Sequence, residues 1–77
     1  MDKVHEQKFN FVRHELLQLL KAIDRDILKA EYEILDDEIE IVTVYWLTSE
    51  GFSSDRKVNV TGDSLQALTR DVLKVIG

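Results

Sequence analysis

Two histidines are the first residues of this chain that could carry chemistry. His5 and His14 are nine positions apart in one predicted helix, which places them on opposite sides of it and excludes a shared metal ion within one subunit. Neither has a nucleophile or an orienting carboxylate that the sequence pairs with it. We therefore expect one residue of the helix start and one surface residue, with no role in catalysis or metal binding.

Carboxylates form the second candidate, because six of them crowd one predicted hairpin: Glu31, Glu33, Asp36, Asp37, Glu38 and Glu40. A calcium loop needs ligands at regular offsets and a glycine at its sharp turn, and this cluster has neither. A charged turn that keeps an apolar hairpin soluble and discourages edge pairing explains it better. We expect no metal ion and no cofactor here.

The loop that precedes the last predicted strand is the third candidate. Its lone Gly51 is no phosphate cradle, since phosphate-binding turns need several glycines between a strand and a helix. No base is recognisably paired with its serines and threonines. Phe52 either folds back onto the core, which we favour, or contacts a partner. The sequence thus predicts no catalytic residue, and we expect that the protein is not an enzyme.

Size and charge restrict the partners further. The 77 residues make one domain, 1–77, and the net charge of −5 repels phosphate backbones and anionic lipids on average. Cysteine is absent, which excludes disulfides and thiolate metal sites and indicates a reducing compartment. The start of the chain lacks the features of a signal peptide, and no apolar segment approaches the roughly 20 residues that span a bilayer. We expect a cytoplasmic protein with no nucleic-acid or membrane partner.

An amphipathic helix opens the chain. Its predicted apolar stripe consists of Phe9, Val12, Leu16, Leu19, Leu20, Ile23 and Ile27. Asp2 is the predicted N-cap, and the helix is expected to end at 24–26, with a possible extra turn to about Lys29. A second helix should follow Gly62, with Asp63 and Gln66 as a capping-box-like start.

Three strands are predicted between these helices. Residues 31–34 alternate polar and apolar, residues 39–47 are β-branched and aromatic, and residues 56–61 alternate again. A loop of two or four residues at Asp36 and Asp37 would place Tyr32 opposite Ile41 on one face. The prediction is an α+β fold of order α-β-β-β-α, a three-stranded antiparallel meander packed by two helices. Double-stranded RNA-binding domains share this order, but they need a basic start of the closing helix, and Gly62-Asp63-Ser64 is acidic.

The middle strand carries more apolar residues than a sheet with one wet face allows. Ile39, Ile41, Tyr45 and Leu47 share one parity, and Val42, Val44 and Trp46 share the other. Three explanations stay open: a helix on each face, a β-bulge near residues 41–42, or an apolar patch that another chain covers.

A patch covered by another chain suits a small domain without disulfides or metals. The predicted interface comprises Val42, Val44, Trp46, Phe11, Leu17 and Phe52. We hypothesise a non-catalytic interaction protein that forms a homodimer or binds another protein. The alternative is an acidic mimic of nucleic acid that binds a basic protein through residues 31–40.

Overall fold

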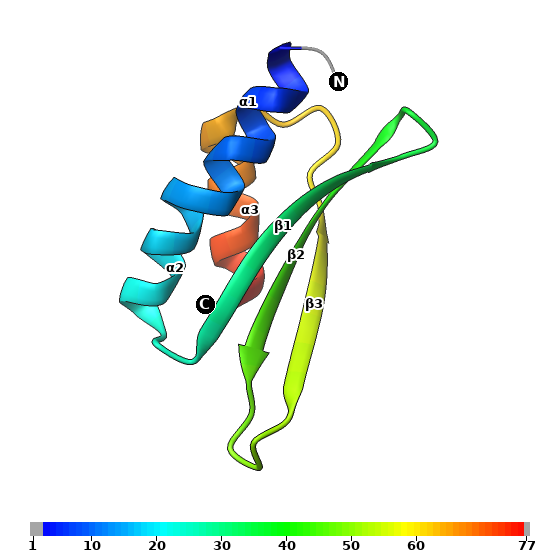
Figure 1. Ribbon diagram of the computed structural model, residues 1–77. Helices are drawn as coiled ribbons and strands as arrows, with labels where there is room; N and C mark the ends of the chain where they lie inside the picture. The colour runs from blue at the N-terminus through cyan, green and yellow to red at the C-terminus, as the bar shows by residue number, and fades with distance from the viewer. Residues whose placement is uncertain (1–2, 77) are drawn as a thin grey trace.

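The computed structural model describes residues 3–76, and Figure 1 shows the order of their elements. The N-terminal helix consists of α1 (Lys3–Phe11), a π-helical segment (Val12–Leu16) and α2 (Leu17–Ile23); β1 (Ile27–Leu35), β2 (Ile39–Leu47), β3 (Ser53–Asn59) and α3 (Leu65–Ile76) follow. The strands form one antiparallel sheet of order β1-β2-β3. The predicted α+β fold of order α-β-β-β-α is confirmed. The predicted cap Asp2 lies outside the described residues.

The buried side chains of the N-terminal helix recur at every fourth residue: Lys8, Val12, Leu16 and Leu20. In an α-helix of 3.6 residues per turn, each step of four advances by about 40° around the axis. The wider turns of the π-helical segment reduce this drift, so the four side chains stay on the side of the sheet. Leu19 and Ile23, which the sequence placed in the buried stripe, are exposed for this reason. The helix ends where predicted, because Asp24 is extended.

The register of the first hairpin differs from the prediction by one residue. Tyr32 pairs with Val42, where the sequence predicted Ile41, and Ile34 pairs with Glu40. Because side chains alternate along a strand, a shift of one residue moves every side chain to the other face of the sheet. The predicted pairing, and with it the assignment of the two faces of β2, is wrong.

The turn of this hairpin explains the shift. Leu35 pairs with Ile39, so the loop holds three residues rather than two or four. Asp36 and Asp37 both have positive φ angles, 52° and 57°, and the amide of Glu38 donates a hydrogen bond to the carbonyl of Leu35 at 3.1 Å. Two consecutive positive φ angles are typical of a type I′ turn, whose twist matches that of the strands.

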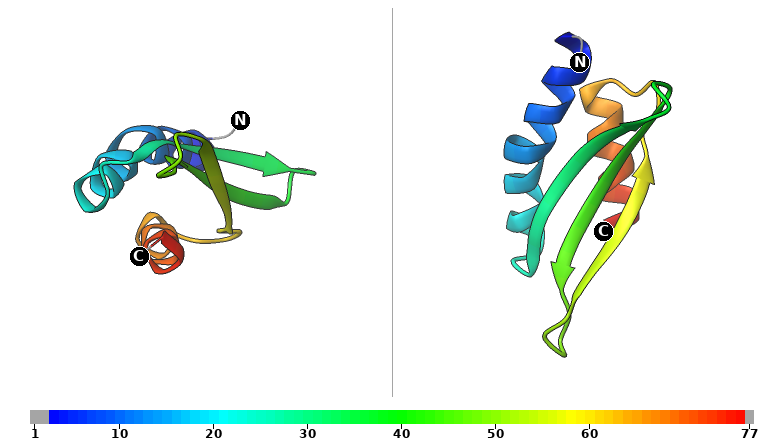
Figure 2. Two further views of the ribbon diagram at one scale, coloured as in Figure 1. Left: turned by 90° about the horizontal axis from the view of Figure 1, so that it is seen from below. Right: turned by 45° about the vertical axis from the view of Figure 1, so that its right-hand side comes forward.

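Both helices cover the same face of the sheet. The core joins the N-terminal helix, the inner side chains of all three strands, and α3; it comprises Val12, Leu16, Leu20, Ile27, Ala30, Tyr32, Val42, Val44, Val58, Val60, Leu68 and Val72. The N-terminal helix packs mainly against β1 and α3 against β3. In the right-hand view of Figure 2, the face of the sheet turned toward the reader carries no helix, and α3 lies behind it. A helix on each face is therefore wrong.

The second alternative, a bulge at residues 41–42, is also wrong, since the only register shift between β1 and β2 lies at Ile27 and Lys29. The third strand begins at Ser53, earlier than predicted. The cap of α3 is Ser64 rather than Asp63, because the Ser64 hydroxyl accepts a hydrogen bond from the amide of Ala67 at 3.2 Å. Within residues 3–76, no helix is long and apolar enough to cross a bilayer.

Candidate functional site

The predicted interface residues do not share one surface. Val42 and Val44 are completely buried beneath the two helices, so neither side chain is accessible to a partner in the folded chain. Trp46, at the end of the same inner face, is half-buried against this core. Phe11 and Leu17 are also half-buried against it, on the N-terminal helix. The register shift of one residue accounts for the misplaced patch on β2.

Phe52 is the most exposed of the predicted interface residues. It lies in the loop between β2 and β3 with 71% of its surface exposed. Its amide donates to the Thr48 hydroxyl at 3.1 Å, and its carbonyl accepts from the Thr48 amide at 2.7 Å. These two bonds close the loop on itself, and the prediction that Phe52 folds back onto the core is wrong.

The surplus of apolar residues on β2 exists, but it lies on the face without helices. We call this side of the sheet the open face, and the outward residues of β2 the apolar row: Ile39, Ile41, Thr43, Tyr45 and Leu47. Ile39 and Leu47 are 40% and 42% exposed, and Leu35 of β1, which pairs with Ile39, is exposed as well. Water-exposed sheet faces are normally polar. Thr43 in the middle of the row is buried and Ile41 and Tyr45 are half-buried, so the exposed apolar surface of this face lies mainly at the two ends of the row. An apolar row on a sheet face without helices is a candidate surface for a partner.

Charged side chains border the apolar row on both sides. Two cross-strand rows carry a charge on each side, from β1 through β2 to β3: Lys29, Tyr45, Asp55; and Glu31, Thr43, Lys57. In a third row, Glu33 and the uncharged Asn59 lie on the two sides of Ile41. All six flanking side chains are exposed. The charges are opposite across the first two rows, and the third row pairs Glu33 with the uncharged Asn59, so the open face carries charges of both signs.

Lys29 has two partners on this face. Its ammonium lies 3.0 Å from a carboxylate oxygen of Glu31, and 4.6 Å from the centre of the Tyr45 ring. Both charged side chains are more than half exposed, so this ion pair contributes at most about 1 kcal/mol and can exchange partners readily.

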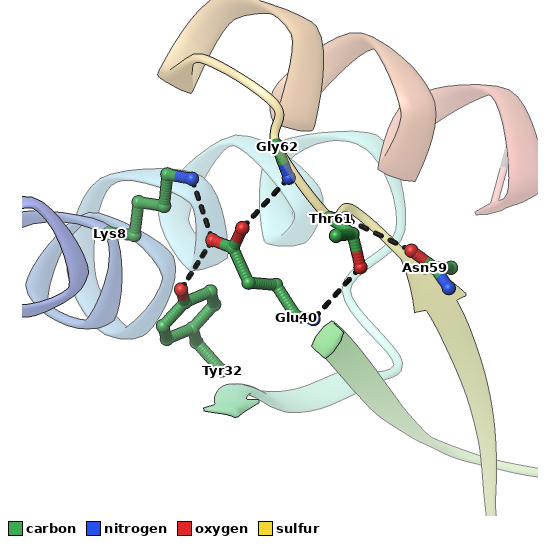
Figure 3. Close-up of polar contacts among 6 residues, drawn as sticks. All are labelled: Lys8, Tyr32, Glu40, Asn59, Thr61 and Gly62. Carbon is green, nitrogen blue, oxygen red and sulfur yellow. Dashed lines mark hydrogen bonds and ion pairs between the residues drawn. The ribbon is translucent and has the colours of Figure 1, made fainter. Parts of the chain in front are cut away.

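A buried polar cluster on the helix side of the sheet is the second candidate site (Figure 3). The carboxylate of Glu40 accepts hydrogen bonds from the Lys8 ammonium at 2.6 Å, the Tyr32 hydroxyl at 2.6 Å and the Gly62 amide at 2.8 Å. The Glu40 amide donates to the Thr61 hydroxyl at 3.0 Å. The cluster joins α1, β1, β2 and the segment that leads into α3.

The electrostatics of this cluster favour a permanently ionised Glu40. Burial alone would raise the pKa of its carboxyl, but the hydrogen bonds from Lys8, Tyr32 and Gly62 outweigh burial and lower the pKa from 4.5 to about 2. An acid or base in catalysis needs a pKa near the working pH. Glu40 is thus suited to holding elements together and unsuited to proton transfer.

A pocket of about 550 Å³ lies beside this cluster and includes His5, Lys8, Glu40 and Asp63 in its lining. The His5 ring lies 6.5 Å from the Tyr32 ring. The Asp71 carboxyl, together with burial, raises the pKa of Asp63. Oδ2 of Asp63 is buried and has no hydrogen-bond partner among residues 3–76. Among residues 3–76, no three histidine or carboxylate side chains are grouped so that they could hold a metal ion. His14 is exposed on the N-terminal helix.

An apolar groove of about 670 Å³ separates the N-terminal helix from α3. Its apolar walls are formed by Phe11 and Leu19 on one side and by Leu65 and Leu73 on the other. Of the predicted interface residues, Phe11 alone lines this groove. The groove and the open face lie on opposite sides of the molecule.

No protein-family model, no curated protein and no solved structure matches this chain. The choice between candidate sites therefore depends on the geometry of the chain itself. The sequence interpretation missed the buried pair Lys8 and Glu40, although two signals were present. Lys8 stands four residues before Val12 in the buried series, and Glu40 has the parity of Val42 and Val44. A lysine and a glutamate at two core positions indicate a pair.

Proposed function

We propose that this chain is a small non-catalytic interaction protein that binds another polypeptide through the open face of its sheet. The apolar row on a face without helices is the observation that carries the proposal. Ile41 and Tyr45 flank the buried Thr43 in the middle of the row, and polar or charged side chains of β1 and β3 lie on both sides of them. An apolar centre with a polar rim is the usual anatomy of a protein interface.

Two further observations support a binding role over an enzymatic one. Lys8 and Glu40 bind each other, and Glu40 is held ionised well below neutral pH. The apolar row has no acid, base or nucleophile among its own side chains other than Thr43 and Tyr45, and Thr43 is buried. The absence of cysteine from the sequence agrees with a cytoplasmic location.

The alternative function, mimicry of nucleic acid by residues 31–40, has weaker support. Glu40 is buried and bound to Lys8, which removes it from the surface. Glu31 is paired with Lys29, and Lys57 lies on the same face. A mimic needs a field of one sign, whereas the open face carries both Lys29 and Lys57 beside its acidic side chains. These mixed charges favour a protein partner with its own mixed charges.

Photo-crosslinking in cells tests the proposal. A photoreactive amino acid is placed at Ile41 in the apolar row and, as a matched control, at Gln18, which is exposed on the helix side. We expect irradiation to give a discrete covalent adduct from position 41 and none from position 18, because only the open face is covered by a partner.

The adduct at position 41 should disappear when Tyr45 is replaced by Lys, since this puts a charge within the apolar row, and Tyr45 is not part of the core. Equal crosslinking from positions 18 and 41, or none from position 41, contradicts the proposal. Mass spectrometry of the adduct identifies the partner, and a second copy of this chain counts as a partner.

A further inference from the structure

We propose that the partner on the open face is a second copy of this chain, packed face to face about a two-fold axis that runs parallel to the strands between the two sheets. This inference rests on the proposed function and names its partner. It follows from the order of charges across the rows, because a two-fold axis in this direction sets β1 of one copy over β3 of the other and β2 over β2.

Opposite charges then meet on both sides of the apolar row. Lys29 lies over Asp55 of the second copy, and Glu31 lies over Lys57, since each pair occupies one cross-strand row. Symmetry repeats both contacts, so four ion pairs border the interface. Glu33 meets the side-chain amide of Asn59, which can donate a hydrogen bond to it.

The apolar row is kept in register by the same axis. Ile41 lies over Ile41 of the second copy and Tyr45 over Tyr45, so the outward residues of β2 cover each other along its whole length. Packed sheets are rotated by about 30° relative to each other. For strands about 4.8 Å from the axis, this rotation displaces the outer positions by about 2.4 Å, less than the roughly 6.8 Å between successive outward residues. The charge pairs therefore survive the rotation.

A two-fold axis perpendicular to the strands fits less well. Centred on Thr43, it overlaps the apolar rows and sets Lys29 against Glu33, but it also sets Glu31 against Glu31 and Lys57 against Lys57, and these like-charge contacts offset that attraction. If the axis passes midway between the Thr43 and Tyr45 rows, Glu31 faces Lys29 and Lys57 faces Asp55, so opposite charges pair. Ile39 then extends beyond the end of the second copy's apolar row. Only the axis parallel to the strands satisfies both the charges and the apolar row.

The area of the open face determines how tightly the two copies are expected to bind. Three strands about 4.8 Å apart and up to nine residues long cover roughly 400 Å², below the roughly 800 Å² per partner of a standard interface. We therefore expect a weak dimer with a micromolar dissociation constant, which salt weakens because the ion pairs are at the rim.

Charge reversal in separate copies provides the test. The purified full chain carries Lys29→Glu in one preparation and Asp55→Lys in another, and sedimentation velocity measures the self-association of each variant and of their equimolar mixture. Each variant alone repeats a like-charge contact twice, so we expect its dimerisation to weaken by about tenfold or more. In the mixture, the glutamate introduced in one variant meets the lysine introduced in the other, and the unchanged Asp55 of the first meets the unchanged Lys29 of the second. Association should therefore return to the wild-type strength.

Lys21→Glu, an exposed change on the helix side, is the control and should leave dimerisation unchanged. A mixture that associates no better than the single variants overturns the proposed axis. A wild-type chain that stays monomeric at high micromolar concentration overturns the dimer itself. If the chain is monomeric, a photo-crosslinked adduct between position 41 and a different protein would still support the proposed function. If position 41 gives no adduct either, the proposed function is wrong as well.

Discussion

At the scale of single residues, two lysine–glutamate pairs of similar length differ in their surroundings. Lys8 and Glu40 are 2.6 Å apart with side chains 8% exposed, whereas Lys29 and Glu31 are 3.0 Å apart and more than half exposed. The loss of one partner from a buried pair leaves a charge without compensation, whereas water replaces a lost partner at the surface. The two pairs should therefore differ in their effect on folding.

The matched variants Lys8→Met and Lys29→Met measure this difference. We expect Lys8→Met to lower the free energy of unfolding by about 3 kcal/mol, because Glu40 stays buried without its ammonium partner. Lys29→Met should lower it by less than about 1 kcal/mol. Urea denaturation at neutral pH gives both values, and equal effects of the two variants would contradict the structure.

Glu40 should also make folding stability depend on pH. Its pKa of about 2 in the folded chain lies below its ordinary value of 4.5. The sign is that of a lowered carboxyl pKa: the ionised group contributes roughly 3 kcal/mol above pH 4.5, and this contribution is lost as the pH falls toward 2. Denaturation of the wild type and of Glu40→Gln should differ most at neutral pH and converge near pH 2. A gap that stays constant over this range would show that Glu40 acts by shape alone.

At the scale of elements, the sequence predicted the type and the order of the helices and strands, but not the register in which β1 pairs with β2. Strand 39–47 and the end of the first helix followed from β-branched residues and from the loss of helical spacing. The faces did not follow, because the loop after Leu35 could hold an even or an odd number of residues, and its parity decides which face of β2 is buried. The excess of apolar residues in β2 was visible in the sequence, but the sequence did not show which of its two faces is covered by the helices.

Substitutions at neighbouring positions of β2 test the register. Val42→Asp places a carboxylate in the core without a partner, which costs several kcal/mol and should abolish folding of so small a domain. Ile41→Asp places the same group on the open face and should leave the circular dichroism spectrum close to that of the wild type. If both aspartate variants unfold, the milder variants Val42→Thr and Ile41→Thr can be compared, and we expect Val42→Thr to be the less stable of the two. The reverse order would restore the register that the sequence predicted.

The turn of the first hairpin allows a stabilising change. Asp37 has a φ angle of 57°, a conformation that glycine adopts without steric cost. Asp37→Gly should raise the free energy of unfolding by roughly 0.5 to 1 kcal/mol. Glu38→Gly is the control in the same turn, since Glu38 is not among the described residues with positive φ, and should be neutral or destabilising. Thermal unfolding of both variants shows whether the positive φ angle of Asp37 lowers the stability of the folded chain.

At the scale of the whole molecule, one layer of helices and one sheet leave half of the sheet without cover. The helices bury Val42 and Val44, whereas on the other side Ile41 and Tyr45 are only half-buried, Tyr45 beneath the Lys29 ammonium. A chain of 77 residues buries a smaller share of its surface than a large domain does. A partner on the open face would complete a sandwich of two sheets enclosed by two layers of helices.

The central claim is that the open face is the interaction surface, and amide NMR spectra over a dilution series test it most directly. From high to low micromolar concentration, we expect shifts to change at outward residues of all three strands, with Ile41, Tyr45, Lys29 and Asp55 among the largest. Amides lining the groove between the helices, such as those of Leu19 and Leu73, should stay constant. Changes confined to that groove, or spectra that do not change with concentration, would contradict self-association through the open face.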